Sequence, residues 1–152
     1  MVAKVAIIGA GGMGGWFAHF FKSRGNSVIV SDRDSSKAKR LAVKIHAKYS
    51  SNNADAARGS DIILLAIPAN ATSEVIEEIL PALRTNALIC EISATKSVVR
   101  PALRSAEKRG VRVASIHPMF GPLARGIRGR RIIAIRTGKN IGGYKTMKHL
   151  LQ

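Results

Sequence analysis

The chain is poor in cysteine, in acidic residues and in aromatic residues, and each shortage narrows what it can be. Cys90 is the single cysteine of 152 residues, so no disulfide can form within the chain, and a lone thiol fits a reducing compartment. It lies in the apolar run 87–90, which predicts a buried structural thiol rather than a nucleophile. No apolar run approaches the roughly 20 residues that a membrane-spanning helix needs.

The aromatic content of 5% includes no basic–aromatic stacking motif, which argues against nucleic-acid binding as a primary role. The first residues also lack the marks of a secretory leader, because residues 1–4 lead directly into an apolar strand-like run. A hydrophobic content of 46% is too high for a disordered chain. We therefore expect a soluble, cytoplasmic protein that forms one domain over residues 1–152.

Acidic residues are scarce, and the imbalance is uneven along the chain. There are 25 lysines and arginines against 9 acids, which gives a net charge of +16. From Lys96 to Gln152 there are 14 basic residues and one acid, Glu107. Such a field attracts anions: cofactor phosphates, dicarboxylate substrates, nucleic acid or an acidic partner. The basic run 125–131 is interpreted either as a solvated loop or as a loop that steers an anion.

What the chain does contain is a regular alternation of strands and helices. Apolar runs predict strands at 4–8, 27–31, 61–67, 87–92, 111–116 and 131–135. Helical periodicity predicts helices at 12–24, 36–48, 72–83 and 97–109, a helical turn near 54–57 and a further helix from Gly142. Thr72 or Ser73 is expected to cap the helix at 72–83. This alternation predicts an α/β fold with a doubly wound, mainly parallel sheet.

A glycine-rich turn follows the first predicted strand and precedes the first predicted helix. Residues 9–14 read Gly-Ala-Gly-Gly-Met-Gly, which has Gly-x-Gly-x-x-Gly spacing. Gly9 allows the tight turn, Gly11 lets the backbone approach a pyrophosphate, and Gly14 lets the helix pack close to the sheet. The N–H groups at the helix start, including those of Gly12 and Met13, would then face the phosphates. This context predicts a Rossmann-type dinucleotide site.

The residues around the next strand ends suggest which dinucleotide binds. Asp32 ends the second predicted strand, where a carboxylate would accept hydrogen bonds from the adenosine ribose. A carboxylate repels a 2′-phosphate and so favours NAD, whereas the adjacent Arg33, with Lys37 nearby, is able to hold that phosphate and leaves NADP open. Ile67 and Pro68 are expected to line the path of the nicotinamide half.

His117 is the candidate for acid–base chemistry. It follows the strand predicted over 111–116 and precedes Pro118, whose ring restricts it to extended backbone. Open α/β sheets bind ligands beyond the carboxyl ends of their strands, and an imidazole accepts a proton near neutral pH. The other histidines, His19, His46 and His149, lack such a setting. No group of residues has metal-ligand spacing, so we expect no metal.

Taken together, these segments resemble the prephenate and arogenate dehydrogenases, and the archaeal-type members in particular. The resemblance covers nearly the whole chain and rests on residues 9–14, 61–68, 91–96 and, above all, the His-Pro-Met-Phe-Gly-Pro run at 117–122. It implies an NAD(P)-dependent oxidoreductase of tyrosine biosynthesis that decarboxylates prephenate or arogenate oxidatively. His117 would accept the proton of the ring hydroxyl while the hydride passes to the nicotinamide and CO2 leaves.

The chain departs from this family at residues 91–96. Members usually have Asp-x-x-Ser-x-Lys, whereas this chain has Glu-Ile-Ser-Ala-Thr-Lys. The serine that helps to hold the substrate hydroxyl therefore falls on Ala94, and Ser93 or Thr95 is left as its substitute. By resemblance, Ser93 and Lys96 join the histidine as catalytic candidates.

By resemblance, the family also has a helical C-terminal domain that supplies dimer contacts and much of the substrate pocket; because the sequence ends at Gln152, we expect a chain without this domain. Two interpretations stay open. The chain is an enzyme acting on a small-molecule substrate, or it is a non-catalytic NAD(P)-binding module or half of a split enzyme that needs a partner domain. Hydroxyacid dehydrogenases and imine reductases share the front half, but they tend to use a lysine farther along than the His-Pro-Met segment.

Overall fold

A computed structural model describes residues 2–137 and 141–152. Met1 is the first residue of the segment that is expected to lack a secretory leader, and it lies outside the described residues. Within these residues one sheet has the strand order β3-β2-β1-β4-β5-β6-β7. The strands are β1 (Lys4–Ile8), β2 (Ser27–Ser31), β3 (Lys48–Tyr49), β4 (Ile62–Leu65), β5 (Leu88–Glu91), β6 (Arg112–Pro118) and β7 (Ile132–Ile135). Neighbours pair in parallel except β6 and β7, which confirms the predicted doubly wound, mainly parallel α/β sheet.

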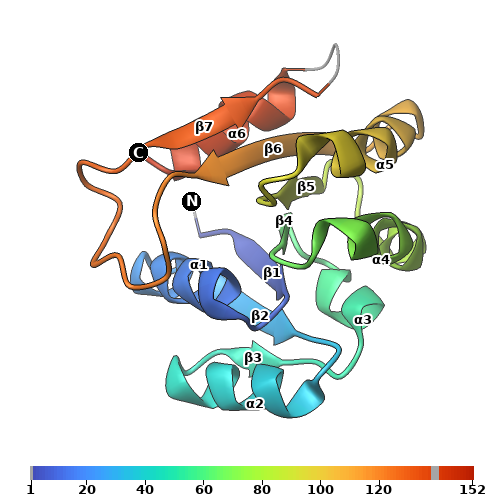
Figure 1. Ribbon diagram of the computed structural model, residues 1–152. Helices are drawn as coiled ribbons and strands as arrows, with labels where there is room; N and C mark the ends of the chain where they lie inside the picture. The colour runs from blue at the N-terminus through green and yellow to red at the C-terminus, as the bar shows by residue number, and fades with distance from the viewer. Residues whose placement is uncertain (1, 138–140) are drawn as a thin grey trace.

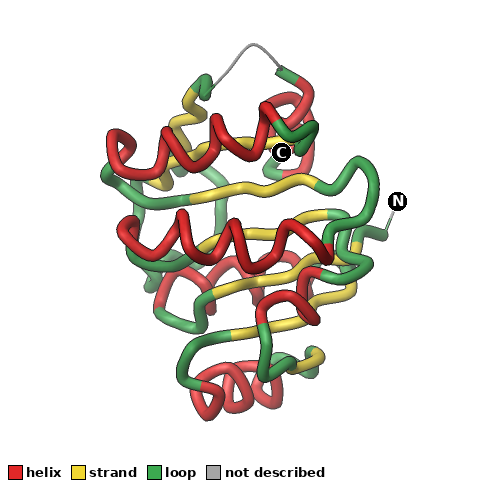
Figure 2. The backbone as a smooth tube through the Cα atoms, turned by 90° about the vertical axis from the view of Figure 1, so that its right-hand side faces the viewer, coloured by secondary structure: helices red, strands yellow, loops and turns green. Residues whose placement is uncertain are grey.

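Helices cover both faces of the sheet (Figures 1 and 2). They are α1 (Gly12–Ser23), α2 (Ser35–Lys44), α3 (Asn53–Ala57), α4 (Thr72–Ile79), α5 (Lys96–Lys108) and α6 (Gly142–Leu150), with the 3₁₀ helices η1 (Ala69–Ala71) and η2 (Leu80–Ala82). One face carries α1, α2 and α6, and the other carries α3, α4 and α5. None of the described helices has the length and apolar character to cross a bilayer.

The sheet is buried on both faces because its central strands are apolar at successive positions. In β1, Val5 and Ile7 belong to the core under α1, whereas Ala6 and Ile8 belong to the core on the opposite face. This two-sided burial fixes the register of the strands, since a slip by one residue would exchange the two cores. The carboxyl ends of β1, β4 and β5 are thereby aligned along one edge.

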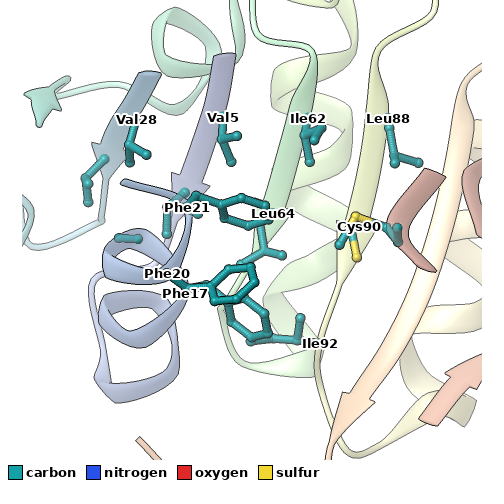
Figure 3. Close-up of a cluster of buried hydrophobic side chains, with 14 of the residues drawn as sticks. Val5, Phe17, Phe20, Phe21, Val28, Ile62, Leu64, Leu88, Cys90 and Ile92 are labelled. Carbon is teal, nitrogen blue, oxygen red and sulfur yellow. The ribbon is translucent and has the colours of Figure 1, made fainter. Parts of the chain in front are cut away.

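The core under α1 contains the buried aromatic side chains of that helix (Figure 3). Phe17 and Phe21 are fully buried there, and the Cys90 thiol belongs to the same cluster. Burial raises the pKa of Cys90, because a thiolate would lose its hydration in this setting. Cys90 is therefore the buried structural thiol that its apolar run predicts.

The helix predicted over 36–48 is too long. It ends at Lys44, Ile45 is its C-terminal cap, and His46 takes a φ of 54°, in the left-handed region that interrupts a helix. Lys48 and Tyr49 instead form β3, which pairs in parallel with β2. A strand of two residues shows no alternation, so periodicity did not reveal it.

Two smaller predictions are also wrong. Thr72 is the first residue of α4 and makes no capping hydrogen bond, because the chain enters α4 through η1 and Ala71, at the cap position, is already helical. The strand predicted over 111–116 runs on to Pro118, because β7 pairs with it antiparallel up to that residue. His117 therefore lies inside β6 rather than after it.

Candidate functional site

The glycine turn between β1 and α1 is closed on its inner side and open on its outer side. Gly9 has a φ of +104°, and a Cβ at this position would overlap the carbonyl oxygen of Ala66. A Cβ on Gly14 would overlap the carbonyl oxygen of Gly9, so only glycine lets α1 approach the sheet this closely. By contrast, a Cβ on Gly11 would meet nothing within 4 Å, which leaves room for a ligand to approach the backbone.

The start of α1 is unshielded. Gly11, at its cap position, makes no side-chain hydrogen bond, and the first turn contains no acidic residue. The first N–H groups, at the positive end of the helix dipole, therefore have no side-chain acceptor. A cavity of about 910 Å³ opens on this turn and continues along α1; Gly11, Gly12, Trp16, Lys37, Pro122 and Arg125 are among the residues that line it.

Asp32 joins the glycine turn to the turn after β2. Its Oδ2 accepts a hydrogen bond from the Ala10 N–H at 2.6 Å, and its Oδ1 accepts one from the Asp34 N–H at 2.7 Å. Asp34 in turn caps α2, and hydrogen bonds from the Ser36 hydroxyl and the Lys37 N–H hold its pKa below the ordinary value. The predicted ribose-binding carboxylate thus also fixes the backbone of the glycine turn, and Arg33 beside it is exposed.

Ile67 and Pro68 follow β4 at the same edge of the sheet. The Ile67 side chain lies against the glycine turn, with its Cγ2 at 3.1 Å from the position of a Cβ on Gly9. Pro68 is exposed and precedes η1. Because β1 and β4 are parallel neighbours, both residues are brought next to the predicted cofactor turn.

His117 lies near the carboxyl end of β6, opposite Ile133 of β7. The residue is partly buried, and its Nδ1 atom is buried without a hydrogen-bond partner among the described residues. No described side chain therefore selects which ring nitrogen carries the proton. Parallel pairing of β1, β4, β5 and β6 brings this imidazole to the edge of the sheet that also carries the glycine turn.

The structure brings two of the predicted catalytic residues, Ser93 and Lys96, together on the carboxylate of Glu91, a residue that was not predicted. Glu91, at the end of β5, is 1% exposed, and its carboxylate accepts hydrogen bonds from Ser93 and Lys96. Ser115 of β6 donates its hydroxyl to the same carboxylate. Ala94, at the position of the family serine, is exposed. Sequence reasoning did not select Glu91 or Ser115, although an acid ending an apolar strand was a usable signal.

The loop after β6 folds back onto α1 and is a second feature that sequence reasoning missed. In Figure 1 this orange segment passes beside α1. The Trp16 Nε1–H donates to the carbonyl of Ala124 at 2.8 Å, and its ring lies 4.7 Å from that of Phe120, centroid to centroid. Pro122 lies close to Gly12. The loop therefore connects the strand of His117 to the helix that starts at the glycine turn. A tryptophan beside the glycine motif was the available signal.

No cluster of His, Cys, Asp or Glu able to hold a metal ion is found within residues 2–137 and 141–152.

Comparisons with known proteins agree with this arrangement. The family profile described as "Prephenate dehydrogenase, nucleotide-binding domain" matches residues 17–132. A probable arogenate/prephenate dehydrogenase of Methanocaldococcus jannaschii is 39% identical over 119 residues, which cover 78% of this chain and 27% of that protein. The T-protein of Haemophilus influenzae is 29% identical over 121 residues, which cover 79% of this chain and 28% of that protein. The chain thus spans little more than a quarter of either relative.

Solved structures share the fold. The 3-hydroxyisobutyrate dehydrogenase of Mycobacterium tuberculosis superimposes with a TM-score of 0.87 at 17% identity, over 99% of this chain and 51% of that one. An imine reductase of Myxococcus stipitatus, solved with NAD+, gives 0.85 at 20% identity, over 99% of this chain and 52% of that one. At such identities the likeness concerns the fold alone. Because the profile match covers most of the sheet and includes the segments at 61–68, 91–96 and 117–122, the chain belongs to the prephenate dehydrogenase family and contains its nucleotide-binding domain.

Proposed function

We propose that this chain binds NAD(P) at its glycine turn and forms the cofactor-binding, proton-accepting side of a prephenate or arogenate dehydrogenase. One observation carries the proposal: the glycine turn and His117 lie at the same carboxyl edge of one parallel sheet, where open α/β sheets bind ligands. The names of the relatives support the substrate class, since two of them are described as arogenate/prephenate dehydrogenase and 4-amino-4-deoxyprephenate dehydrogenase.

The residues of the turn fit a dinucleotide. The turn is closed by Gly9 and Gly14 and open at Gly11, and the first N–H groups of α1 are unshielded. Those of Gly12 and Met13 would donate to the pyrophosphate. Bound NAD(P) supplies the hydride acceptor of the reaction. The residues proposed to hold it are Gly9, Gly11, Gly12, Met13, Gly14, Asp32, Arg33, Ile67 and Pro68.

Asp32 makes NAD the favoured form. Each of its carboxylate oxygens accepts one backbone hydrogen bond and keeps a further lone pair for a ribose hydroxyl. Its negative charge opposes a 2′-phosphate, whereas the exposed Arg33 and Lys37 would attract one. The balance of these charges, rather than the fold, sets the preference.

His117 is proposed as the proton acceptor. Oxidation of a ring alcohol removes a hydride from carbon and a proton from oxygen, and loss of the ring carboxylate as CO2 then completes the aromatic ring. The imidazole needs to be held beside that hydroxyl in its neutral form. The excess of arginines after Lys96, including Arg125 at the cavity, favours the approach of a dicarboxylate.

The test combines binding with turnover. NAD and NADP are titrated into the purified chain by calorimetry, and formation of the reduced nicotinamide is followed with prephenate and with arogenate. We expect binding, tighter for NAD, and turnover that is lost in His117→Ala but kept in His149→Ala, a change of an exposed histidine on α6. Absence of binding by either dinucleotide would overturn the proposal.

One observation favours a second candidate, a non-catalytic NAD(P)-binding module or one half of a split enzyme: by the resemblance, Ala94 stands where family members use a serine hydroxyl. Binding without turnover of either substrate would favour this second candidate. Turnover gained in Ala94→Ser would then show that the missing hydroxyl limits the reaction.

A further inference from the structure

Glu91 is a carboxylate that the fold buries at the candidate site. It is 1% exposed and lies opposite Ser115 in the pairing of β5 with β6. A buried carboxylate is strongly unfavourable unless charged or polar groups surround it. The hydrogen-bond partners of Glu91 therefore explain how the fold accommodates a buried carboxylate. They also identify the groups that this carboxylate orients.

The described hydrogen-bond partners of the Glu91 side chain are either catalytic candidates themselves or lie close to one in the chain. Its Oε1 accepts from the Lys96 ammonium at 2.6 Å and from the Ser115 hydroxyl. Its Oε2 accepts from the N–H and the hydroxyl of Ser93, each at 2.8 Å. Lys96 also donates to the carbonyl oxygen of Ile116 at 2.7 Å. These bonds connect the end of β5, the start of α5 and the last part of β6.

The connection reaches the imidazole through the backbone. The carbonyl held by Lys96 belongs to the peptide that joins Ile116 to His117. Side chains alternate along a strand, so Ser115, held by Glu91, and His117 point to the same face of the sheet. His117 Nδ1 has no hydrogen-bond partner among the described residues, so no hydrogen bond at this nitrogen fixes the ring, and the backbone sets the point from which the ring extends.

We propose that Glu91 is a positioning residue, which fixes the Ile116–His117 peptide through Lys96 and Ser115 and thereby places the imidazole. Lys96 then acts through that peptide rather than on a substrate, because two of the three protons of its ammonium are already engaged. The effect on catalysis rests on the function proposed above, whereas the positioning itself does not.

Stability alone is a poor explanation for this arrangement. A buried ion pair adds little relative to apolar residues of similar volume, and the neighbouring strand positions Ile89 and Val113 show that this face accepts apolar side chains. A polar group at Glu91 does what an apolar one cannot: it orients an ammonium and a hydroxyl in defined directions.

The experiment observes His117 directly, without cofactor or substrate. The chain is labelled with 13C-histidine, and the four histidine Cε1–H signals are recorded by NMR. The signal of His117 is assigned by its loss in His117→Gln. The test variant is Glu91→Gln, which keeps the shape and removes the charge. The matched control is Glu74→Gln, the same change at an exposed position of α4.

We expect Glu91→Gln to shift or split the His117 signal while the signals of His19, His46 and His149 and the far-UV circular dichroism stay as in the wild type. Glu74→Gln should leave all four signals unchanged. An unchanged His117 signal in folded Glu91→Gln overturns the proposal. If that variant does not fold, Glu91→Gln/Lys96→Met, which removes both charges, takes its place with the same expected shift. Failure of both to fold also overturns it, because the network would then hold the fold rather than the imidazole.

Kinetics give a second readout where the wild type turns over. Misplacing a catalytic group typically costs about 10- to 100-fold in rate, so Glu91→Gln should lower kcat by about that factor with an unchanged KM for NAD(P). A rise in KM at constant kcat would contradict positioning. If the wild type binds no dinucleotide, the proposed function fails, but the NMR comparison still decides the role of Glu91.

Discussion

The glycines of the proposed cofactor turn have two different roles: Gly14 allows close packing, and Gly11 leaves space for a ligand. Gly14→Ala places a methyl group against the carbonyl of Gly9, and we expect it to lower the free energy of unfolding by about 1–3 kcal/mol, as overpacking does. Gly11→Ala meets no atom within 4 Å but puts a poorer capping residue at the start of α1, so we expect a smaller loss, below about 1 kcal/mol. Urea denaturation followed by circular dichroism measures both.

Gly11→Ala is also expected to affect binding of the cofactor. Gly11→Ala should weaken NAD binding by at least about tenfold, equivalent to 1.4 kcal/mol, because its methyl group occupies the space that a phosphate approaches. Gly15→Ala is the control, since its Cβ would make an ordinary contact with Leu41 at 3.6 Å. This control should bind NAD normally and gain up to about 1 kcal/mol in stability, as alanine does in a helix. Equal affinity of Gly11→Ala and the wild type for NAD would contradict the proposal that a phosphate approaches the backbone at Gly11.

Cys90 should be inert in the folded chain. Its side chain is fully buried and its pKa is raised by that burial, so the thiolate that reacts with disulfide reagents is suppressed over the whole working pH range. At about pH 8, we expect Cys90 of the folded chain not to react with Ellman's reagent during the time that the unfolded chain needs to react completely. Rapid labelling of the native protein would show that β5 opens readily.

Among the elements, the loop after β6 depends on α1. Trp16→Phe removes the hydrogen bond to the Ala124 carbonyl but keeps an aromatic ring beside Phe120. We expect a loss of about 1 kcal/mol in the free energy of unfolding and faster cleavage by trypsin after Arg125, an exposed residue of that loop. Cleavage at the wild-type rate would indicate that the ring contacts alone hold the loop.

Sequence patterns predicted those elements whose signal is local and repeated. The strands at β1, β4 and β5 and the helices α1 and α5 follow from apolar runs and 3.6-residue periodicity, which a single segment contains. The strand β3 and the extension of β6 to Pro118 depend on partners far away in the chain. Such pairing is decided by tertiary contacts, which no local pattern contains.

The same distinction holds for the site. Spacing alone predicts the glycine turn and Asp32 as a cofactor site, because a phosphate-binding turn needs specific residues at fixed intervals. The partners of Glu91 lie in the loop after β5, at the start of α5 and on β6. The most distant, Ser115, is 24 residues away in the chain, and the bond from Trp16 to Ala124 spans 108 residues. Their proximity is a product of the fold.

Across the whole molecule, positive charge is in excess. The chain has 25 basic residues against 9 acids, and the ion pairs of Arg58 with Asp55, Arg84 with Asp61 and Arg109 with Glu77 are exposed. Repulsion between cations therefore outweighs these attractions. We expect Tm to rise by about 2–5 °C between about 50 and 500 mM KCl. A fall in Tm would show that the ion pairs dominate.

The positive charge is also found beside the open edge of the sheet, at the antiparallel strand β7. One edge of β7 pairs with β6, and the other meets no strand within the described residues, so its N–H and C=O groups are a template for a strand from another molecule. Arg130 and Arg131 precede β7 and Arg136 follows it, all exposed. Like charges at both ends of this edge would repel the same edge of a second copy. The same repulsion that lowers the stability of a single chain is thus expected to oppose aggregation. Salt that screens the charges should therefore raise the stability of the fold and, at the same time, favour association through β7.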